Sequence, residues 1–113
     1  MCTQTTLNII TNKVVDAARD SLGDKLDKVI LYGSYARGDH DSESDIDIMV
    51  LADIPAEDAN RLDMDMAKFT SRLGLEHDVV ISLHIKDCDT FYKYLGVLPF
   101  YQNVLRDGVV LSA

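Results

Sequence analysis

The chain has 113 residues, a hydrophobic content of 47% and a formal charge of −8, with 11 Lys and Arg against 19 Asp and Glu. These values are typical of one globular domain over residues 1–113 with no membrane-spanning segment and no signal peptide, and they argue against a broad basic surface for binding nucleic acid directly. The two cysteines, Cys2 and Cys88, have no C-x-x-C spacing, so we expect reduced thiols in a cytoplasmic protein.

The first third of the sequence predicts a helix, a strand and a tight turn. Apolar residues recur at helical spacing from Thr6 to Leu22, and the pattern stops just before Gly23. A short β-prone run from Lys28 to Tyr32 then meets Gly33 and Ser34. We expect this pair to form a turn that leads into a helix of one or two turns.

The next predicted strand carries two acidic residues. From Ser44 to Leu51 the sequence alternates, so that Asp45 and Asp47 share one face and Ile46 and Ile48 share the other. Both carboxylates are therefore expected to point the same way, beside a buried face.

The remaining pattern predicts three helices and further extended segments. They are a helix from Pro55 that ends at Gly74, a strand from Asp78 to Ile85, a helix capped by Asp89 and running to about Leu95, a helix from Pro99 to Arg106 that stops at Gly108, and a short Val-Val-Leu tail. No repeat, low-complexity tract or linker divides the chain.

Acidic residues occupy every second position from Asp39 to Asp47, and three interpretations compete with a metal site there. A solvated loop does not explain why the acids continue into a half-buried strand. A calcium loop of the EF-hand type would need glycine at Ser44 and glutamate at Val50. A P-loop would need lysine and Ser or Thr where Asp39 and His40 stand.

The remaining hypothesis combines the glycine-serine turn with the paired aspartates. Backbone N–H groups at such a turn favour phosphate, and two carboxylates can hold a divalent cation. Mg²⁺ prefers oxygen ligands and commonly bridges carboxylates to substrate phosphates. The negative charges of this segment are thus explained by a cation that binds between them and a nucleotide.

Gly33-Ser34, ten residues, and then Asp45-Ile46-Asp47 resembles the signature of the polymerase-beta-like nucleotidyltransferase superfamily, and the short chain resembles its minimal branch. The resemblance covers nearly the whole sequence, and it implies an α/β (α+β) fold in which helices pack against a small mixed sheet. It implies that Gly33 and Ser34 contact a nucleoside triphosphate, that Asp45 and Asp47 bind two Mg²⁺ ions, and that Asp78 is the third catalytic and metal-binding carboxylate. Arg37, one helical turn after Ser34, is a candidate nucleotide-binding residue.

The resemblance also implies a partner. Minimal nucleotidyltransferases of this kind are often paired with a small helical HEPN-type toxin, and several such antitoxins transfer AMP from ATP to a tyrosine of the toxin. We expect that activity here, with a partner or a homo-oligomer supplying the surface that a second domain gives larger relatives. Two alternatives stay open: an antitoxin or regulatory subunit that masks its partner without catalysis, and nucleotidyl transfer to a small molecule.

Several other polar residues carry no site prediction. The histidines His40, His77 and His84 are scattered without ligand spacing, which argues against a histidine metal site. The remaining acids of the stretch, at positions 39, 41 and 43, are expected to form a solvated rim.

Overall fold

A computed structural model describes residues 3–112, and its centre is a four-stranded sheet with the strand order β3-β2-β1-β4. The strands are β1 (Leu26–Tyr32), β2 (Ile46–Ala52), β3 (Ile81–Asp87) and β4 (Val109–Ser112). Strand β1 runs antiparallel to β2 and to β4, whereas β2 and β3 are parallel. The predicted small mixed sheet is confirmed.

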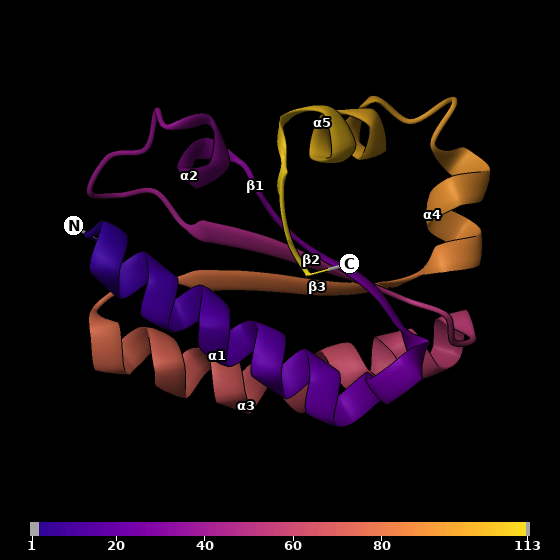
Figure 1. The fold of residues 1–113 in the computed structure, drawn as a ribbon, viewed down its shortest axis with the longest axis horizontal. Coiled ribbons are helices and arrows are strands. Elements are labelled where there is room, and N and C mark those ends of the chain that lie inside the picture. The colour runs from indigo at the N-terminus through magenta and orange to yellow at the C-terminus, as the bar shows by residue number, and fades with distance from the viewer. Residues whose placement is uncertain (1–2, 113) are drawn as a thin grey trace.

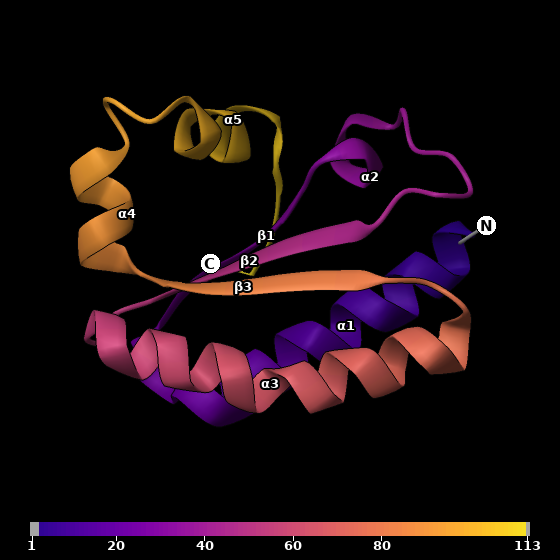
Figure 2. The ribbon, with the colours of Figure 1, turned by 180° about the vertical axis from the view of Figure 1, so that it is seen from behind.

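The helices lie on both sides of this sheet. They are α1 (Gln4–Leu22), the 3-10 turn η1 (Gly23–Lys25), α2 (Ser34–Arg37), α3 (Ala56–His77), α4 (Cys88–Tyr94) and α5 (Pro99–Asp107). The long helices α1 and α3 cover one face, and α2 and α5 lie over the other, with α4 at one side (Figure 1). Figure 2 shows the same arrangement from behind, with β3 and α3 nearest the viewer. None of the helices within residues 3–112 combines the length and the apolar character needed to cross a membrane.

The central strand β2 is anchored from both faces. Ile46, Ile48 and Val50 are fully buried in the core formed with α1 and α3. Met49 and Leu51 point the other way and pack in a smaller cluster with residues of α4 and α5. Apolar burial on both sides leaves β2 little freedom to shift, and its first residues therefore form a rigid platform.

Helix α3 extends further than the sequence pattern predicts. We expected it to end at Gly74, but it continues to His77 and is capped by Asp78, so β3 begins at Ile81 instead of Asp78. Gly74 serves a different purpose: it is buried, and a Cβ there would lie 2.5 Å from the carbonyl oxygen of Val79. The glycine permits the close approach of helix and following chain and does not stop the helix.

The cap of α4 also differs from the prediction. The side chain of Asp87 accepts a hydrogen bond from the Thr90 amide at 2.9 Å, so Asp87 is the N-cap and Asp89 lies in the first turn. Hydrogen bonds from Thr90 lower the pKa of the Asp87 carboxyl although burial, the largest influence, acts to raise it.

The segment from Val109 to Ser112 forms a strand of the sheet, which its short apolar pattern alone did not reveal. Strand β4 pairs with β1 through Ile30 opposite Val110 and Leu31 opposite Val109. Just before it, a Cβ on Gly108 would collide with the Val104 carbonyl and the Ile30 side chain. Glycine at this position allows the end of α5 to rest directly on β1.

Cys88 is a free, half-buried cysteine at the start of α4. Burial, together with the nearby Asp27, raises the pKa of its thiol to about 11, so the thiol form dominates at neutral pH. Cys2 lies outside the described residues.

Candidate active site

Gly33 and Asp47 are in close contact at the junction of β1 and α2. Gly33 has φ 74° and ψ −157°, a conformation that is essentially restricted to glycine. A Cβ built on it would collide with Oδ2 of Asp47. The glycine therefore both makes the turn and leaves room for the carboxylate that faces it.

Asp47 has a negatively charged environment that a cation would relieve. Its carboxyl is half-buried, and its pKa is raised, first by burial and then by the like charge of Asp45, while His84 and Arg37 act in the opposite direction. Asp45 is exposed and lies just before β2 begins at Ile46. The predicted pair is thus present at one end of the central strand, with the two carboxylates close enough to repel each other.

Tyr32 and Ser82 flank Asp47 on the two neighbouring strands. Tyr32, at the end of β1, is the register partner of Asp47 on the antiparallel side, and Ser82 of β3 is its partner on the parallel side. Burial and the charge of Asp47 raise the pKa of the Tyr32 hydroxyl to about 12. Tyr32 is therefore neutral at physiological pH and can only act there as a hydrogen-bonding and packing group.

A pocket of about 210 Å³ opens beside Gly33, on the side of β1 and α5. Its walls include Arg37 from α2 and Phe100 and Asn103 from α5, and the Phe100 ring meets that of Tyr32 edge to face with the centroids 5.7 Å apart. The Arg37 guanidinium is exposed and 3.2 Å from a carboxylate oxygen of Asp39. A phosphate in this pocket could recruit Arg37 from that surface ion pair at little cost, because exposed pairs contribute little stability.

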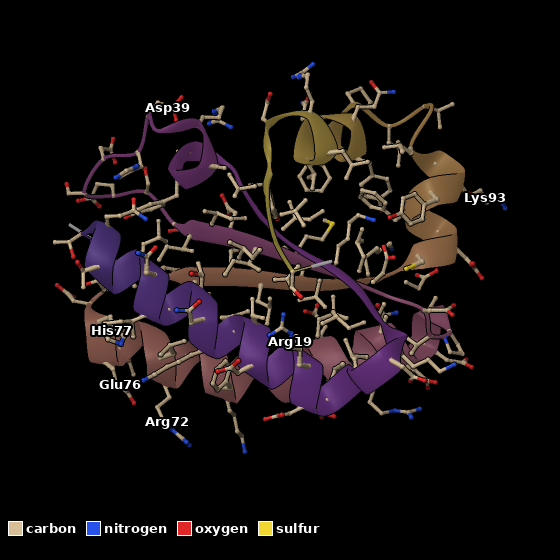
Figure 3. All side chains as sticks on the ribbon, viewed as in Figure 1. Arg19, Asp39, Arg72, Glu76, His77 and Lys93 are labelled. Carbon is tan, nitrogen blue, oxygen red and sulfur yellow. The ribbon has the colours of Figure 1, made fainter. Side chains whose placement is uncertain are left out.

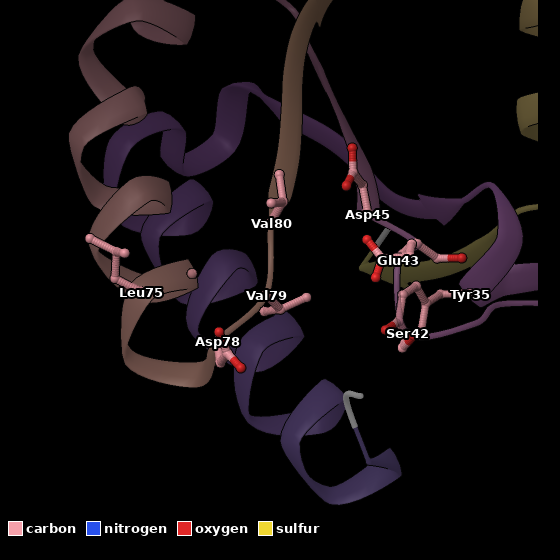
Figure 4. Close-up of a pocket in the computed structure, with 10 residues that line it drawn as sticks. Tyr35, Ser42, Glu43, Asp45, Leu75, Asp78, Val79 and Val80 are labelled. Atoms are coloured by element: carbon pink, nitrogen blue, oxygen red, sulfur yellow. The ribbon is translucent and has the colours of Figure 1, made fainter.

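Asp78 lies in a different pocket, of about 270 Å³, between the loop before β2 and the link from α3 to β3. Asp45 and Glu43 come from the loop side of this pocket, and Asp78 comes from the end of α3 (Figure 4). Asp78 is exposed and has a left-handed backbone conformation with φ 54°. It therefore precedes β3, although the sequence pattern placed it at the start of a strand.

The carboxylates do not form a ready-made cage. Within residues 3–112, no three His, Cys, Asp or Glu side chains gather closely enough to hold a metal ion. Asp45 and Asp47 nevertheless fit Mg²⁺, since this ion commonly uses one or two protein carboxylates and takes its other ligands from water and substrate phosphates. Burial first and then the charge of Asp45 raise the pKa of Asp47, and the opposite influences of His84 and Arg37 do not offset them.

The three histidines occupy unrelated positions, as the sequence indicates. His40 stacks on Tyr35 with the ring centroids 4.1 Å apart. His77 ends α3, on the side of the sheet opposite the loop that carries Asp39 (Figure 3). His84 lies on β3, and its ring nitrogen is 3.3 Å from the Ser82 hydroxyl.

Sequence reasoning did not identify Tyr32, Asn103, Ser82 or His84 as neighbours of the site. For Tyr32 a signal existed, since it directly precedes Gly33 at the end of a predicted strand. Asn103 reaches the site only through the packing of α5 on β1, which local patterns do not encode. The alternation of β3 places Ser82 and His84 on one face, but only the register with β2 brings that face next to Asp47.

Relatives of this chain are found among nucleotidyltransferases. The sequence pattern of the family described as a nucleotidyltransferase domain matches residues 12–107. Two relatives from Methanocaldococcus jannaschii, provisionally named protein adenylyltransferases MJ0604 and MJ0141, are 36% identical over 98 residues and 47% identical over 89 residues. These alignments cover 86% and 78% of this chain and 89% and 81% of the two relatives.

Solved structures show the same relationship. A chain in the crystal structure of a toxin-antitoxin with AMP-PNP is similar with a TM-score of 0.57 and 26% identity, over 91% of this chain and 73% of that one. A chain in the structure of the tri-AMPylated Shewanella oneidensis HEPN toxin in complex with MNT antitoxin is similar with a TM-score of 0.52, over 94% of this chain and 71% of that one. The two sequences are 24% identical, so this likeness shows the fold alone. The chain belongs to the family of nucleotidyltransferase domains.

Proposed function

We propose that this protein transfers AMP from ATP to a tyrosine hydroxyl of a HEPN-type partner, that the transfer depends on Mg²⁺, and that it makes the protein an antitoxin. The observation that carries the proposal is the contact between Gly33 and Asp47, which brings the glycine turn next to the aspartate pair. The relatives support the choice of reaction, since two are provisionally named protein adenylyltransferases. The structural neighbours support the choice of partner.

In this proposal each residue of the turn acts on the triphosphate. Gly33 lets the phosphates approach the backbone closely, because it carries no side chain. The Ser34 hydroxyl donates a hydrogen bond to a phosphate oxygen, and Arg37 and Asn103 bind the β- and γ-phosphates from the wall of the adjoining pocket. Together they hold the leaving pyrophosphate on the side of β1 and α5.

Asp45 and Asp47 would hold the divalent ions. Two Mg²⁺ ions bound there would stabilise the charge on the entering and leaving oxygens of the displacement. The two aspartates would hold those ions at the start of β2, where the burial of the strand on both faces keeps the carboxylates in place. The role of Asp78 as the third carboxylate stays a prediction, since its side chain is exposed at the end of α3.

The experiment is to purify the protein with the HEPN-type protein encoded beside it, add Mg-ATP, and measure the masses of both chains. We expect the partner to gain one or more AMP units, with the modified residue located on a tyrosine by peptide fragmentation. The addition should stop when the divalent ion is chelated.

The alternative, an antitoxin that only masks its partner, predicts a different result. Asp47→Asn would then neutralise the toxin as well as the parent protein does, and no adduct would form with either. That result would overturn the proposed catalysis.

A further inference from the structure

The side of Asp47 that faces away from the phosphate-binding turn is formed by β3. Asp47 is paired with Tyr32 on one side and with Ser82 on the other. Gly33 and the pocket that contains Arg37 adjoin the Tyr32 side. The Ser82 side of this carboxylate is therefore free of the groups that would hold the pyrophosphate.

Ser82 and His84 form a hydrogen-bonded pair on this side. Register pairing puts Ser82 beside Asp47 and His84 beside Met49. Because Met49 and Tyr32 belong to the cluster on the α5 face, the side chains of Ser82 and His84 share the face on which Asp47 lies. The Ser82 hydroxyl and the His84 ring are 3.3 Å apart, and the His84 side chain is exposed to solvent.

The electrostatic influence of His84 reaches the aspartate. His84, ahead of Arg37, acts to lower the pKa of the Asp47 carboxyl, although burial and the charge of Asp45 raise it. The imidazole is thus within interaction range of the carboxylate, from the side opposite the turn. Asp78 lines another pocket together with Asp45, and it precedes β3 in the chain, which begins at Ile81.

The in-line geometry of phosphoryl transfer then places the attacking oxygen and the leaving oxygen on opposite sides of the phosphorus. In the displacement at phosphorus, the attacking and leaving oxygens are roughly in line. If pyrophosphate leaves toward Gly33 and Arg37, the acceptor hydroxyl must approach from β3. Ser82 and His84 are the polar side chains that β3 presents there.

We propose that Ser82 and His84 bind the acceptor hydroxyl and receive its proton; the inference rests on the proposed nucleotidyl transfer. The acceptor oxygen forms a bond to the α-phosphorus while the bond from that phosphorus to pyrophosphate breaks, and the pyrophosphate leaves with the bonding electrons. The proton of the hydroxyl passes to the imidazole of His84, directly or through the Ser82 hydroxyl. A histidine-serine pair on β3 thus serves the acceptor side of the reaction.

The kinetic test varies the HEPN-type partner and Mg-ATP separately. His84→Ala should lower kcat by about 100-fold or more, the usual contribution of a positioned acid-base group, while KM for Mg-ATP stays unchanged. His84→Gln should restore KM for the partner without restoring kcat, because an amide can bind the hydroxyl but cannot take its proton. Ser82→Ala should lower kcat/KM for the partner by roughly 2- to 10-fold, the effect of one hydrogen bond.

Lys86→Gln provides the matched control, since Lys86 lies two residues further along the same face of β3, opposite Leu51. We expect this variant to keep both kinetic constants. Thermal unfolding of all four variants shows that each is folded.

A second readout does not depend on turnover. Mn²⁺ added in place of Mg²⁺ should broaden the ring signals of His84 in the NMR spectrum at lower concentration than those of His77, which lies on α3 across the sheet. The broadening of His84 should disappear in Asp47→Asn. Equal or later broadening of His84 would place the metal away from β3 and overturn the inference.

The kinetic outcomes separate the two proposals. If Asp47→Asn abolishes transfer but His84→Ala turns over normally, the acceptor-side inference is wrong and the nucleotidyl transfer stands. If Asp78→Asn shows the large loss of kcat and His84→Ala does not, Asp78 is the acceptor-side group. If Asp47→Asn itself has full activity, the proposed function fails together with the inference.

Discussion

The carboxylate of Asp47 lies in the space that a side chain at residue 33 would need. Gly33 and Asp47 are 14 positions apart in the sequence, yet each limits what the other can be. The glycine turn and the end of the strand that carries Asp47 are thus one structural unit, held between β1 and β2.

Gly33→Ala should disrupt this unit. The backbone conformation of Gly33 costs about 1 to 3 kcal/mol for a residue with a side chain, and the new methyl group must displace the Asp47 carboxylate. We expect a lower free energy of unfolding and loss of the stabilisation that Mg-ATP gives the parent. Urea unfolding with and without Mg-ATP measures both.

Gly38→Ala is the matched control for this variant. Gly38 also has a positive φ, of 78°, but a Cβ there meets no atom within 4 Å. It should therefore lower stability by about 1 to 2 kcal/mol and keep the response to Mg-ATP. If both variants lost that response equally, backbone strain and not the collision with Asp47 would be responsible.

Asp47→Asn should stabilise the metal-free protein at neutral pH. Burial and the charge of Asp45 raise the pKa of Asp47 above its ordinary value of 3.8, so the folded protein holds this proton more tightly than the unfolded chain does. Stability contributed by the group is therefore lost as the pH rises from 3.8 through the folded pKa, and stays lost above it. Thermal unfolding in a chelator should give Asp47→Asn the higher Tm at pH 7 and a smaller advantage near pH 3.

Divalent ions should reverse that order. Mn²⁺ or Mg²⁺ should raise the Tm of the parent protein and leave Asp47→Asn nearly unchanged. Glu43→Gln, a neutralised exposed acid of the neighbouring loop, serves as the control and should behave like the parent. If neither ion changed the Tm of the parent protein at millimolar concentration, the result would contradict a metal site at Asp45 and Asp47.

The N-cap residue of α4, Asp87, stabilises the folded protein at neutral pH and loses this effect in acid, which is opposite to the behaviour of Asp47. Asp87→Ala should cost about 0.5 to 2 kcal/mol at pH 7, and Asp87→Asn clearly less, because an asparagine also caps helices. The pKa of Asp87 is lowered, so its stabilisation is present above 3.8 and disappears as the pH falls through the lower folded value. Urea unfolding at pH 7 and pH 3 should show the difference between the parent and Asp87→Asn shrinking in acid.

Arg37→Gln should weaken nucleotide binding without affecting the fold. Loss of a hydrogen bond to a charged group costs about 1.5 to 3 kcal/mol, and the exposed ion pair with Asp39 adds little to stability. Calorimetry with Mg-ATP measures the change, and Arg61→Gln is the control, since Arg61 forms a similar exposed pair with Asp58 on α3. Equal Kd values for parent and Arg37→Gln would remove Arg37 from the phosphate site.

Local patterns predicted most of the elements and the placement of the two aspartates because these depend on periods of two and about four residues. The alternation around Ile46 and Ile48 was sufficient to put Asp45 and Asp47 on one side, and both lie at one end of β2 as expected. The nucleotidyltransferase fold was recognised from the same motif and is confirmed by the family match.

The errors arose where a residue's role depends on distant neighbours. Gly74 looked like the end of a helix, but it is there because the carbonyl of Val79 passes too close for a side chain. That extension of α3 moved Asp78 off the predicted strand. The pairing of β4 with β1, and of β2 with β3, also depends on tertiary packing, so the surroundings of Asp47 could not be read from the sequence.

The junction of α5 with β1 has a consequence for folding of the chain during its synthesis. Val104 and Gly108 rest against Ile30, and β4 then completes the sheet beside β1, although about 75 residues of synthesis separate the two segments. A nascent chain that has already emerged as far as β3 would carry the glycine turn and both aspartates but would lack Phe100 and Asn103 in the pocket wall. Nucleotide should therefore be captured only once translation has passed α5, so that new molecules become competent in a single late step.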